Sequence, residues 1–191
     1  MNLRSFLRLT AAGLLLGAAA LFGQAAWMRS KAAVASVLIE RSLQSTLRDG
    51  RPRRPWSWAD FHPVARLRVP RLGVTTPVLS NASGATLAFG VGRVPGTGEH
   101  VILAGHRDTW AAFLRDVRVG DALTLAGPGE AHRYCVRAIR VVAAEDVRVL
   151  EGSEHRLILI TCWPFGGLTR SRLRLAVEAE ENGPECPAEK S

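Results

Sequence analysis

The segment "RLILITCWPF" (residues 156–165) is a run of apolar residues that ends on a threonine and a cysteine. A second apolar run, "HVILAG" (100–105), is followed directly by His106 and Arg107. Short apolar runs with such boundaries are typical of buried β-strands. If the two strand ends meet in space, Cys162 and His106 form a cysteine–histidine pair. The alternative is a buried core thiol and a hydrogen-bonded loop histidine.

The segments around these two runs also have the pattern of strands. Apolar residues alternate with charged ones in "ARLRVP" (65–70) and "AHRYCVRAIRVVAAEDV" (131–147), as in half-buried strands. Further strands are predicted at "GVTTPVL" (73–79), "ALTLAG" (122–127) and "RLRLAVEAE" (172–180). Short helices are predicted in "TWAAFLRDV" (109–117) and in the glycine-rich segment 81–100. Seven or eight strands with so little helix predict a mainly β fold, a closed β-barrel with short helices in its loops.

The N-terminal segment is predicted to be a membrane anchor. Residues 9–27 contain no charged residue, and Arg4 and Arg8 precede them. About 20 apolar residues are enough for a transmembrane helix, here after a short cytoplasmic N-terminus (1–8). A cleaved signal peptide is the alternative, because "GAAA" and "GQAA" offer small residues to a signal peptidase. In either case the rest of the chain is predicted to be exported.

A helical and basic linker is predicted over residues 28–57. Apolar residues at helical spacing follow the anchor, and Gly50 and nearby prolines end the helix; the spaced residues are Val34, Val37, Leu38, Leu43 and Leu47. The basic cluster "RDGRPRRP" (48–55) is interpreted as solvated or lipid-facing, because no aromatic nucleic-acid motif accompanies it. The barrel is predicted over 58–179 and a disordered tail over 180–191.

The three cysteines are too few for a disulfide framework, and an odd number leaves at least one unpaired. Cys135 lies in an alternating strand and is expected to be a small core residue. Cys186 lies in the tail and is expected to be dispensable. The five histidines have no metal-ligand spacing.

A reactive cysteine needs a partner that favours its thiolate, and histidine is the usual one. A transient oxyanion needs a donor, which arginine supplies because it keeps its charge. Cys162, His106 and an arginine of the last strand would supply all three groups. The segment "TRSRLRLAVEA" (169–179) offers Arg170, Arg172 and Arg174.

The sequence resembles the sortases, membrane-anchored cysteine transpeptidases, over about Val64 to Val177. The resemblance is carried, in family order and spacing, by "RLRVPRLGVTTPV" (66–78), "VILAGHRDT" (101–109), "FLRDVRVGD" (113–121) and "LILITCWPF" (157–165). The forms "AGHRDT" and "TCWPF" resemble most the single sortases of Gram-negative bacteria, including marine proteobacteria. The family's cysteine motif has a threonine where this chain has Ile158, while Thr161 and Cys162 match.

The resemblance implies a sortase-type barrel that cleaves a C-terminal sorting signal of Leu-Pro-x-Thr-Gly type. Cys162 would be the nucleophile, His106 the general acid, and Arg174 the oxyanion and substrate ligand, with Arg172 as the alternative. Thr161 and Ile160 would contact the substrate.

The partners implied are a secreted protein carrying the sorting signal and an amine acceptor, and no cofactor or metal is needed. The enzyme would sit in the inner (cytoplasmic) membrane with its barrel on the extracytoplasmic, periplasmic side. A membrane-anchored cysteine endopeptidase that uses water, or a non-catalytic anchored binding barrel, is the alternative.

Overall fold

The computed structural model describes residues 3–95, 100–145, 156–167, 171–181 and 186. The chain divides into two compact units, Met1–Leu38 and Ile39–Ser191. The first unit belongs to one long helix, α1 (Leu3–Asp49). Its segment Ala11–Asp49 contains an 18-residue window with a mean hydropathy of at least 1.2 and no buried residue, which is long and apolar enough to cross a bilayer. A signal sequence would pass the same test.

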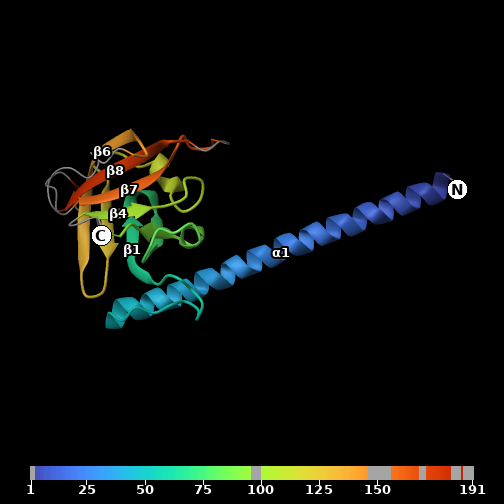
Figure 1. The fold of residues 1–191 in the computed structure, drawn as a ribbon, viewed down its shortest axis with the longest axis horizontal. Helices are drawn as coiled ribbons and strands as arrows, with labels where there is room; N and C mark the ends of the chain where they lie inside the picture. The colour runs from blue at the N-terminus through green and yellow to red at the C-terminus, as the bar shows by residue number, and fades with distance from the viewer. Residues whose placement is uncertain (1–2, 96–99, 146–155, 168–170, 182–185, 187–191) are drawn as a thin grey trace. The chain divides into compact units, whose positions relative to one another are not determined.

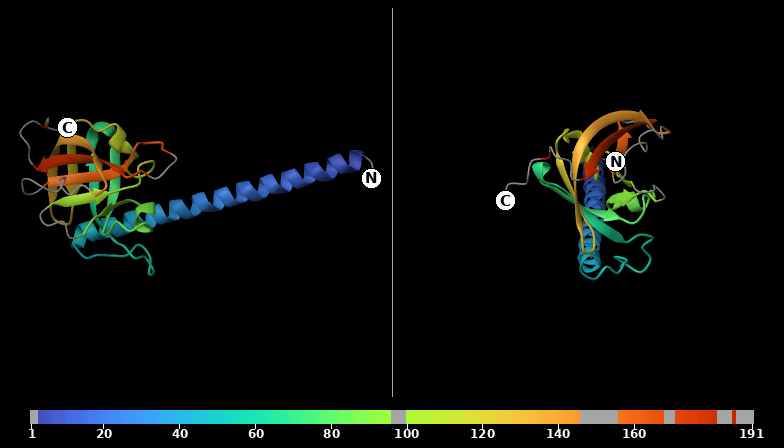
Figure 2. Two further views of the ribbon diagram at one scale, coloured as in Figure 1. Left: turned by 45° about the horizontal axis from the view of Figure 1, so that its top comes forward. Right: turned by 90° about the vertical axis from the view of Figure 1, so that its left-hand side faces the viewer.

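The second unit is built on a closed barrel of eight strands (Figures 1 and 2). In chain order they are β1 (Pro63–Val69), β2 (Val74–Leu79), β3 (Val91–Arg93), β4 (Val101–Ala104), β5 (Ala122–Ala126), β6 (Ala131–Ala143), β7 (Arg156–Trp163) and β8 (Leu173–Glu181). Around the barrel the order is β1-β2-β3-β4-β7-β8-β6-β5. Only two pairs, β2 with β3 and β4 with β7, are parallel. The predicted mainly β, closed barrel is confirmed.

The described residues contain three short 3-10 helices in loops, and the sequence predicted a short helix at two of these places. They are η1 (Pro70–Leu72), η2 (Thr86–Ala88) and η3 (Ala112–Arg115). Alternation along the strands fills the barrel: Ala65, Leu67 and Val69 of β1 are buried in the main core. A second, smaller apolar cluster contains Ile102, Ile158 and Ala176. These residues come from β4, β7 and β8 and lie on the face opposite the main core.

The last turns of α1 belong to the unit that contains the barrel. Ile39, Ser42, Leu43 and Thr46 are buried at helical spacing. Ile39 packs with Phe61 and Leu79, and Glu40 forms an ion pair with Arg66 of β1. The compact unit thus begins at Ile39, and the first strand of the barrel begins at Pro63. The buried face of the helix differs from the predicted set of apolar residues at helical spacing, because Val34 and Val37 are exposed.

Cys135 is buried, as expected of a core residue, but the sequence analysis did not predict its disulfide with Cys186, in which the Cα atoms are 5.5 Å apart. Cys135 lies on β6, and Cys186 lies beyond β8, 51 residues later. The bond links Cys186 to β6 of the barrel, whereas the sequence analysis expected a dispensable tail residue. Arg170 and most of the predicted disordered tail lie outside the described residues.

Loss of the disulfide should destabilise the barrel, because the bond restricts the unfolded chain over a loop of 51 residues. We predict that Cys186→Ser lowers the free energy of unfolding by about 2–4 kcal/mol. The measurement is urea-induced unfolding of the full chain in mild detergent. A reductant should destabilise the wild type by a similar amount and leave the variant unchanged. Equal stability of the two proteins without reductant would contradict the prediction.

A buried carboxylate joins η1 to the start of β5. The Asp121 side chain is 6% exposed. It accepts hydrogen bonds from Nη2 of Arg71 at 2.7 Å and from the backbone N–H of Arg118 at 2.8 Å. Burial by itself would raise the pKa of Asp121, but the bonds from Arg71 and Arg118 outweigh burial, so the pKa is lowered. The ionised form is therefore the form that stabilises the fold.

A carboxyl whose pKa is lower in the folded state stabilises the protein above its unfolded pKa of about 4, and this stabilisation is lost as pH falls further. We predict that Asp121→Asn lowers the free energy of unfolding at pH 7 by about 1–3 kcal/mol. The difference from wild type should shrink below about pH 4. Urea unfolding across this pH range measures it. Asp116→Asn is the control, because Arg71 contacts the backbone carbonyl of Asp116, which this substitution retains. A loss of unfolding free energy in Asp121→Asn that does not change with pH would argue against the ionic role of Asp121.

Candidate active site

Cys162 lies one residue before the end of β7 and is half-buried. It is the free cysteine of the three, all of which belong to the described part of the chain. Side chains alternate along a strand, so Cys162 shares a face with Ile158 and Ile160. Ile158 and Ile160 belong to the small cluster outside the main core. The thiol therefore emerges on the outer face of the barrel.

His106 is brought to the same place by the parallel pairing of β4 with β7. The register runs from Val101 opposite Leu157 to Ala104 opposite Ile160. The next backbone contact continues it, since the N–H of Gly105 donates to the carbonyl of Ile160 at 3.2 Å. Two residues beyond the last pair of the ladder come His106 and Cys162, so the register directs both residues to the same edge of the β4–β7 pair. The His106 side chain is exposed.

The register of β8 distinguishes the two candidate arginines. Arg174 is the direct partner of Cys162 in the antiparallel pairing of β7 with β8, and directly opposed residues share a face. Arg172 lies just before β8 and is exposed. Nη1 of Arg174 donates to the carbonyls of Ser171 and Leu173, both at 2.9 Å. Within the described residues, Nε and Nη2 of Arg174 have no hydrogen-bond partner.

The two residues before Cys162 point in opposite directions. Thr161 is 2% exposed, and its hydroxyl donates to the carbonyl of Gly105 at 2.8 Å. Thr161 thus joins β7 to the end of β4, whereas the resemblance implied a substrate contact for it. Ile160 is half-buried on the outer face, two residues from Cys162. Ile160 can therefore offer an apolar surface next to the thiol.

The turn that follows Cys162 is held by residues that the sequence analysis left without a role. Arg107 donates from Nη1 to the carbonyl of Pro164 at 2.7 Å and from Nη2 to the carbonyl of Gly167. Asp108 accepts a hydrogen bond from the N–H of Gly166 at 3.1 Å. The hydrogen bonds from Arg107 and from Gly166 lower the pKa of the Asp108 carboxyl. The signal in the sequence was their position directly after His106.

An aromatic contact adds to this arrangement. The guanidinium of Arg115, at the end of η3, lies 5.0 Å from the centre of the Phe165 ring. That ring meets Trp163 edge-on, with ring centres 5.6 Å apart. The segment after His106 and the segment after Cys162 are thus packed together over several residues.

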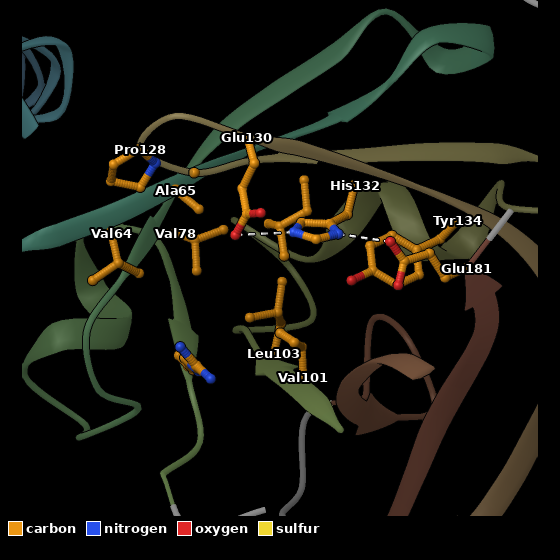
Figure 3. A pocket seen from close by; sticks show the side chains of 13 residues that line it. Val64, Ala65, Val78, Val101, Leu103, Pro128, Glu130, His132, Tyr134 and Glu181 are labelled. Carbon is orange, nitrogen blue, oxygen red and sulfur yellow. Dashed lines mark hydrogen bonds and ion pairs between the residues drawn. The ribbon is translucent and has the colours of Figure 1, made fainter. Parts of the chain in front are cut away.

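A cavity of about 340 Å³ lies at the end of the barrel opposite to Cys162. Val101 and Glu181 line it; Val101 is the first residue of β4 and Glu181 the last of β8. Figure 3 shows Glu130 and Glu181 on either side of His132 in this cavity. Nδ1 of His132 lies 2.6 Å from Glu181 and Nε2 lies 3.3 Å from Glu130. These two carboxylates raise the pKa of His132.

The groups of this cavity are separate from Cys162, which sits where β7 ends and β8 begins. Burial raises the pKa of Tyr134, another lining residue, to about 12. In the parts of the chain that the structure describes, no group of three or more His, Cys, Asp or Glu side chains could hold a metal ion. The strand registers direct a thiol, an imidazole and a guanidinium to the end of the barrel that carries Cys162.

A family model, a curated relative and solved structures all relate this chain to the sortases. A family model described as the sortase domain matches residues 67–182, more than half of the chain. Sortase D of Bacillus subtilis (strain 168) is 27% identical over 106 residues, which are 52% of this chain and 54% of the relative. The chain thus matches about half the length of this curated relative.

Solved sortase structures share the fold. Sortase C1 from Streptococcus agalactiae has a TM-score of 0.58 and 25% identity, over 66% of this chain and 71% of that one. Sortase A from Corynebacterium diphtheriae has the same TM-score and identity, over 79% and 85% of the two chains. A Clostridium perfringens sortase C, solved with the C-terminal cell wall sorting motif, has a TM-score of 0.56 and 21% identity, over 81% and 90%. With the barrel and the match of the family model over more than half of its length, the chain belongs to the sortase family.

Proposed function

We propose that this protein is a cysteine transpeptidase that cleaves a C-terminal sorting signal of Leu-Pro-x-Thr-Gly type and transfers the protein to an amine. The observation that supports it most is the register of three adjacent strands. The β4–β7 pairing leads His106 toward Cys162, and the β7–β8 pairing sets Arg174 opposite Cys162. A thiol, a proton donor and a fixed cation on one face are the groups that acyl transfer requires.

The proposed reaction has two steps. The Sγ of Cys162 attacks the carbonyl carbon of the threonine, the threonine–glycine C–N bond breaks, and His106 gives a proton to the departing amine. This leaves a thioester between Cys162 and the substrate. An amine acceptor then attacks the thioester, gives up a proton to His106, and releases the Cys162 thiolate. Water is the slower acceptor.

Arg174 is proposed to stabilise the oxyanion that forms in both steps. Two of its N–H-bearing atoms, Nε and Nη2, are without a partner in the described residues, while Nη1 is held by the carbonyls of Ser171 and Leu173. A cation held in place before the reaction stabilises a developing negative charge without reorganisation. The apolar residues of the sorting signal would lie along Ile160 and the small cluster next to it.

The protein is proposed to work outside the cytoplasm, anchored in the cytoplasmic membrane by α1. The apolar window within Ala11–Asp49 supports the anchor. The disulfide between Cys135 and Cys186 supports an oxidising compartment, because such bonds persist outside the cytosol. The proposed partners are a secreted protein with the sorting signal and an amine acceptor.

The nucleophile is tested with a peptide that contains Leu-Pro-x-Thr-Gly and with triglycine as the amine. We predict that the full chain in mild detergent joins the peptide to triglycine, and that Cys162→Ala abolishes both cleavage and transfer. Mass spectrometry should detect a thioester on Cys162 of the wild type. Cleavage without any triglycine product would instead indicate an endopeptidase that uses water. Cleavage by Cys162→Ala would exclude the proposed mechanism.

The arginine is tested by a matched pair of variants. We predict that Arg174→Ala lowers kcat/KM for the peptide by a factor on the order of 10² to 10³, the loss expected for one oxyanion donor. Arg172→Ala should leave kcat/KM close to that of the wild type, because Arg172 is exposed and lies outside β8. Steady-state kinetics of the two variants measure the difference. A larger loss in Arg172→Ala would reverse the assignment.

A further inference from the structure

We propose that Arg107 and Asp108 are positioning residues, which hold the turn after Cys162 against the segment that carries His106. This inference rests on the proposed function, in which Cys162 and His106 act together. The proposed reaction requires the thiol and the imidazole to reach the same peptide bond.

The strands alone fix these two side chains from one side. The β4–β7 ladder ends with Ala104 opposite Ile160. The hydroxyl of Thr161 adds one bond, to the carbonyl of Gly105. His106 follows the end of β4, whereas Cys162 still lies in β7, beyond the β4–β7 ladder but paired with Arg174 of β8. Contacts between the segment after His106 and the turn after Cys162 would add a second constraint on the separation of the two side chains.

Arg107 supplies these contacts. Its side chain is 14% exposed although it lies in a surface turn. Its two terminal nitrogens donate to the carbonyls of Pro164 and Gly167, two and five residues after Cys162. The planar guanidinium suits this paired donation, because its N–H groups form a rigid fork. A Cβ at Gly167 would lie 3.0 Å from Nη1 of Arg107, so the backbone approaches the guanidinium closely.

Asp108 completes the arrangement. One carboxylate oxygen accepts from Nε of Arg107 at 2.8 Å, and the other accepts from the N–H of Gly166 at 3.1 Å. Asp108 therefore orients the Arg107 fork and also binds the turn directly. Three nitrogens of Arg107 are occupied by protein oxygens. This distinguishes it from Arg174, whose Nε and Nη2 have no partner among the described residues.

The consequence is that contacts on both sides of the reacting pair fix the pair. The β4–β7 ladder and the Thr161–Gly105 hydrogen bond precede Cys162 and His106 along the two chains. The hydrogen bonds of Arg107 and Asp108 to the turn 164–167 follow them. A displacement of about 1 Å at a reacting group can cost on the order of 10² in rate. Removing the second set of contacts should therefore slow the chemistry and leave the barrel folded.

The test compares Arg107→Met with Arg107→Lys in the full chain. Methionine keeps an unbranched side chain and removes every donor; lysine keeps the charge but cannot bridge two carbonyls with a planar fork. For Arg107→Met we expect kcat for the sorting peptide to fall on the order of 10²-fold, with KM and the circular dichroism spectrum close to wild type. Arg107→Lys should recover only part of the loss. Full activity in Arg107→Lys would mean that charge alone matters and would overturn the proposal.

A second measurement needs no substrate. The rate at which iodoacetamide alkylates Cys162 is measured against pH in the wild type, in His106→Ala and in Arg107→Met. We expect the Arg107→Met profile to move toward that of His106→Ala, because the imidazole is no longer held near the thiol. Asp108→Asn, which keeps an acceptor for the Gly166 N–H, should move it less. A loss of stability alone would not change the profile in this way.

Arg68→Met is the control, because Arg68 is an exposed residue of β1 on the outside of the barrel. Its kinetics and alkylation profile should match the wild type. If the wild type does not cleave sorting peptides, the proposed function fails, and the alkylation profiles still decide the role of Arg107. A wild-type profile in both Arg107→Met and Arg107→Lys would overturn that role.

Discussion

The parallel pairing of β4 with β7 is the constraint on which the arrangement of the outer face depends. The carboxyl ends of parallel strands lie at the same edge of a sheet, so residues that follow them at equal distances leave the sheet at that edge. His106 follows Ala104 by two residues, and Cys162 follows Ile160 by two. The antiparallel pairing of β7 with β8 then brings Arg174 opposite Cys162. Three residues separated by as many as 68 positions in the sequence are thus set by two registers.

Much of the barrel could be predicted from the sequence, because its strands obey the period of two. In β1, Leu67 is buried between Arg66 and Arg68, which is the alternation that the sequence displays. Cys162 and His106 could be singled out because each ends an apolar run. That the two runs end at the same edge of the barrel could not be derived from the runs themselves, since the pairing of β4 with β7 joins segments more than 50 residues apart.

Other features depended on contacts that the sequence does not encode locally. The choice between Arg172 and Arg174 is a matter of register, which a pattern of alternating arginines leaves open. The disulfide was missed because Cys186 follows β8 in a segment with the composition of a disordered tail. The buried face of α1 differs from the predicted apolar face, because Ser42 and Thr46 are buried although they are polar. Their hydroxyls donate to the carbonyls of Arg53 and Arg51 in the segment after the helix.

The disulfide also determines which sulfur remains available. Three cysteines can pair in three ways, and two of these pairings would consume Cys162. The pairing of Cys135 with Cys186 is the one that spares it. Cys186 follows β8, so the pairing that spares Cys162 requires the segment beyond the last strand of the barrel. In a chain truncated before residue 186, Cys135 and Cys162 would be the two remaining cysteines, and a disulfide between them would consume the thiol that the pairing with Cys186 leaves free.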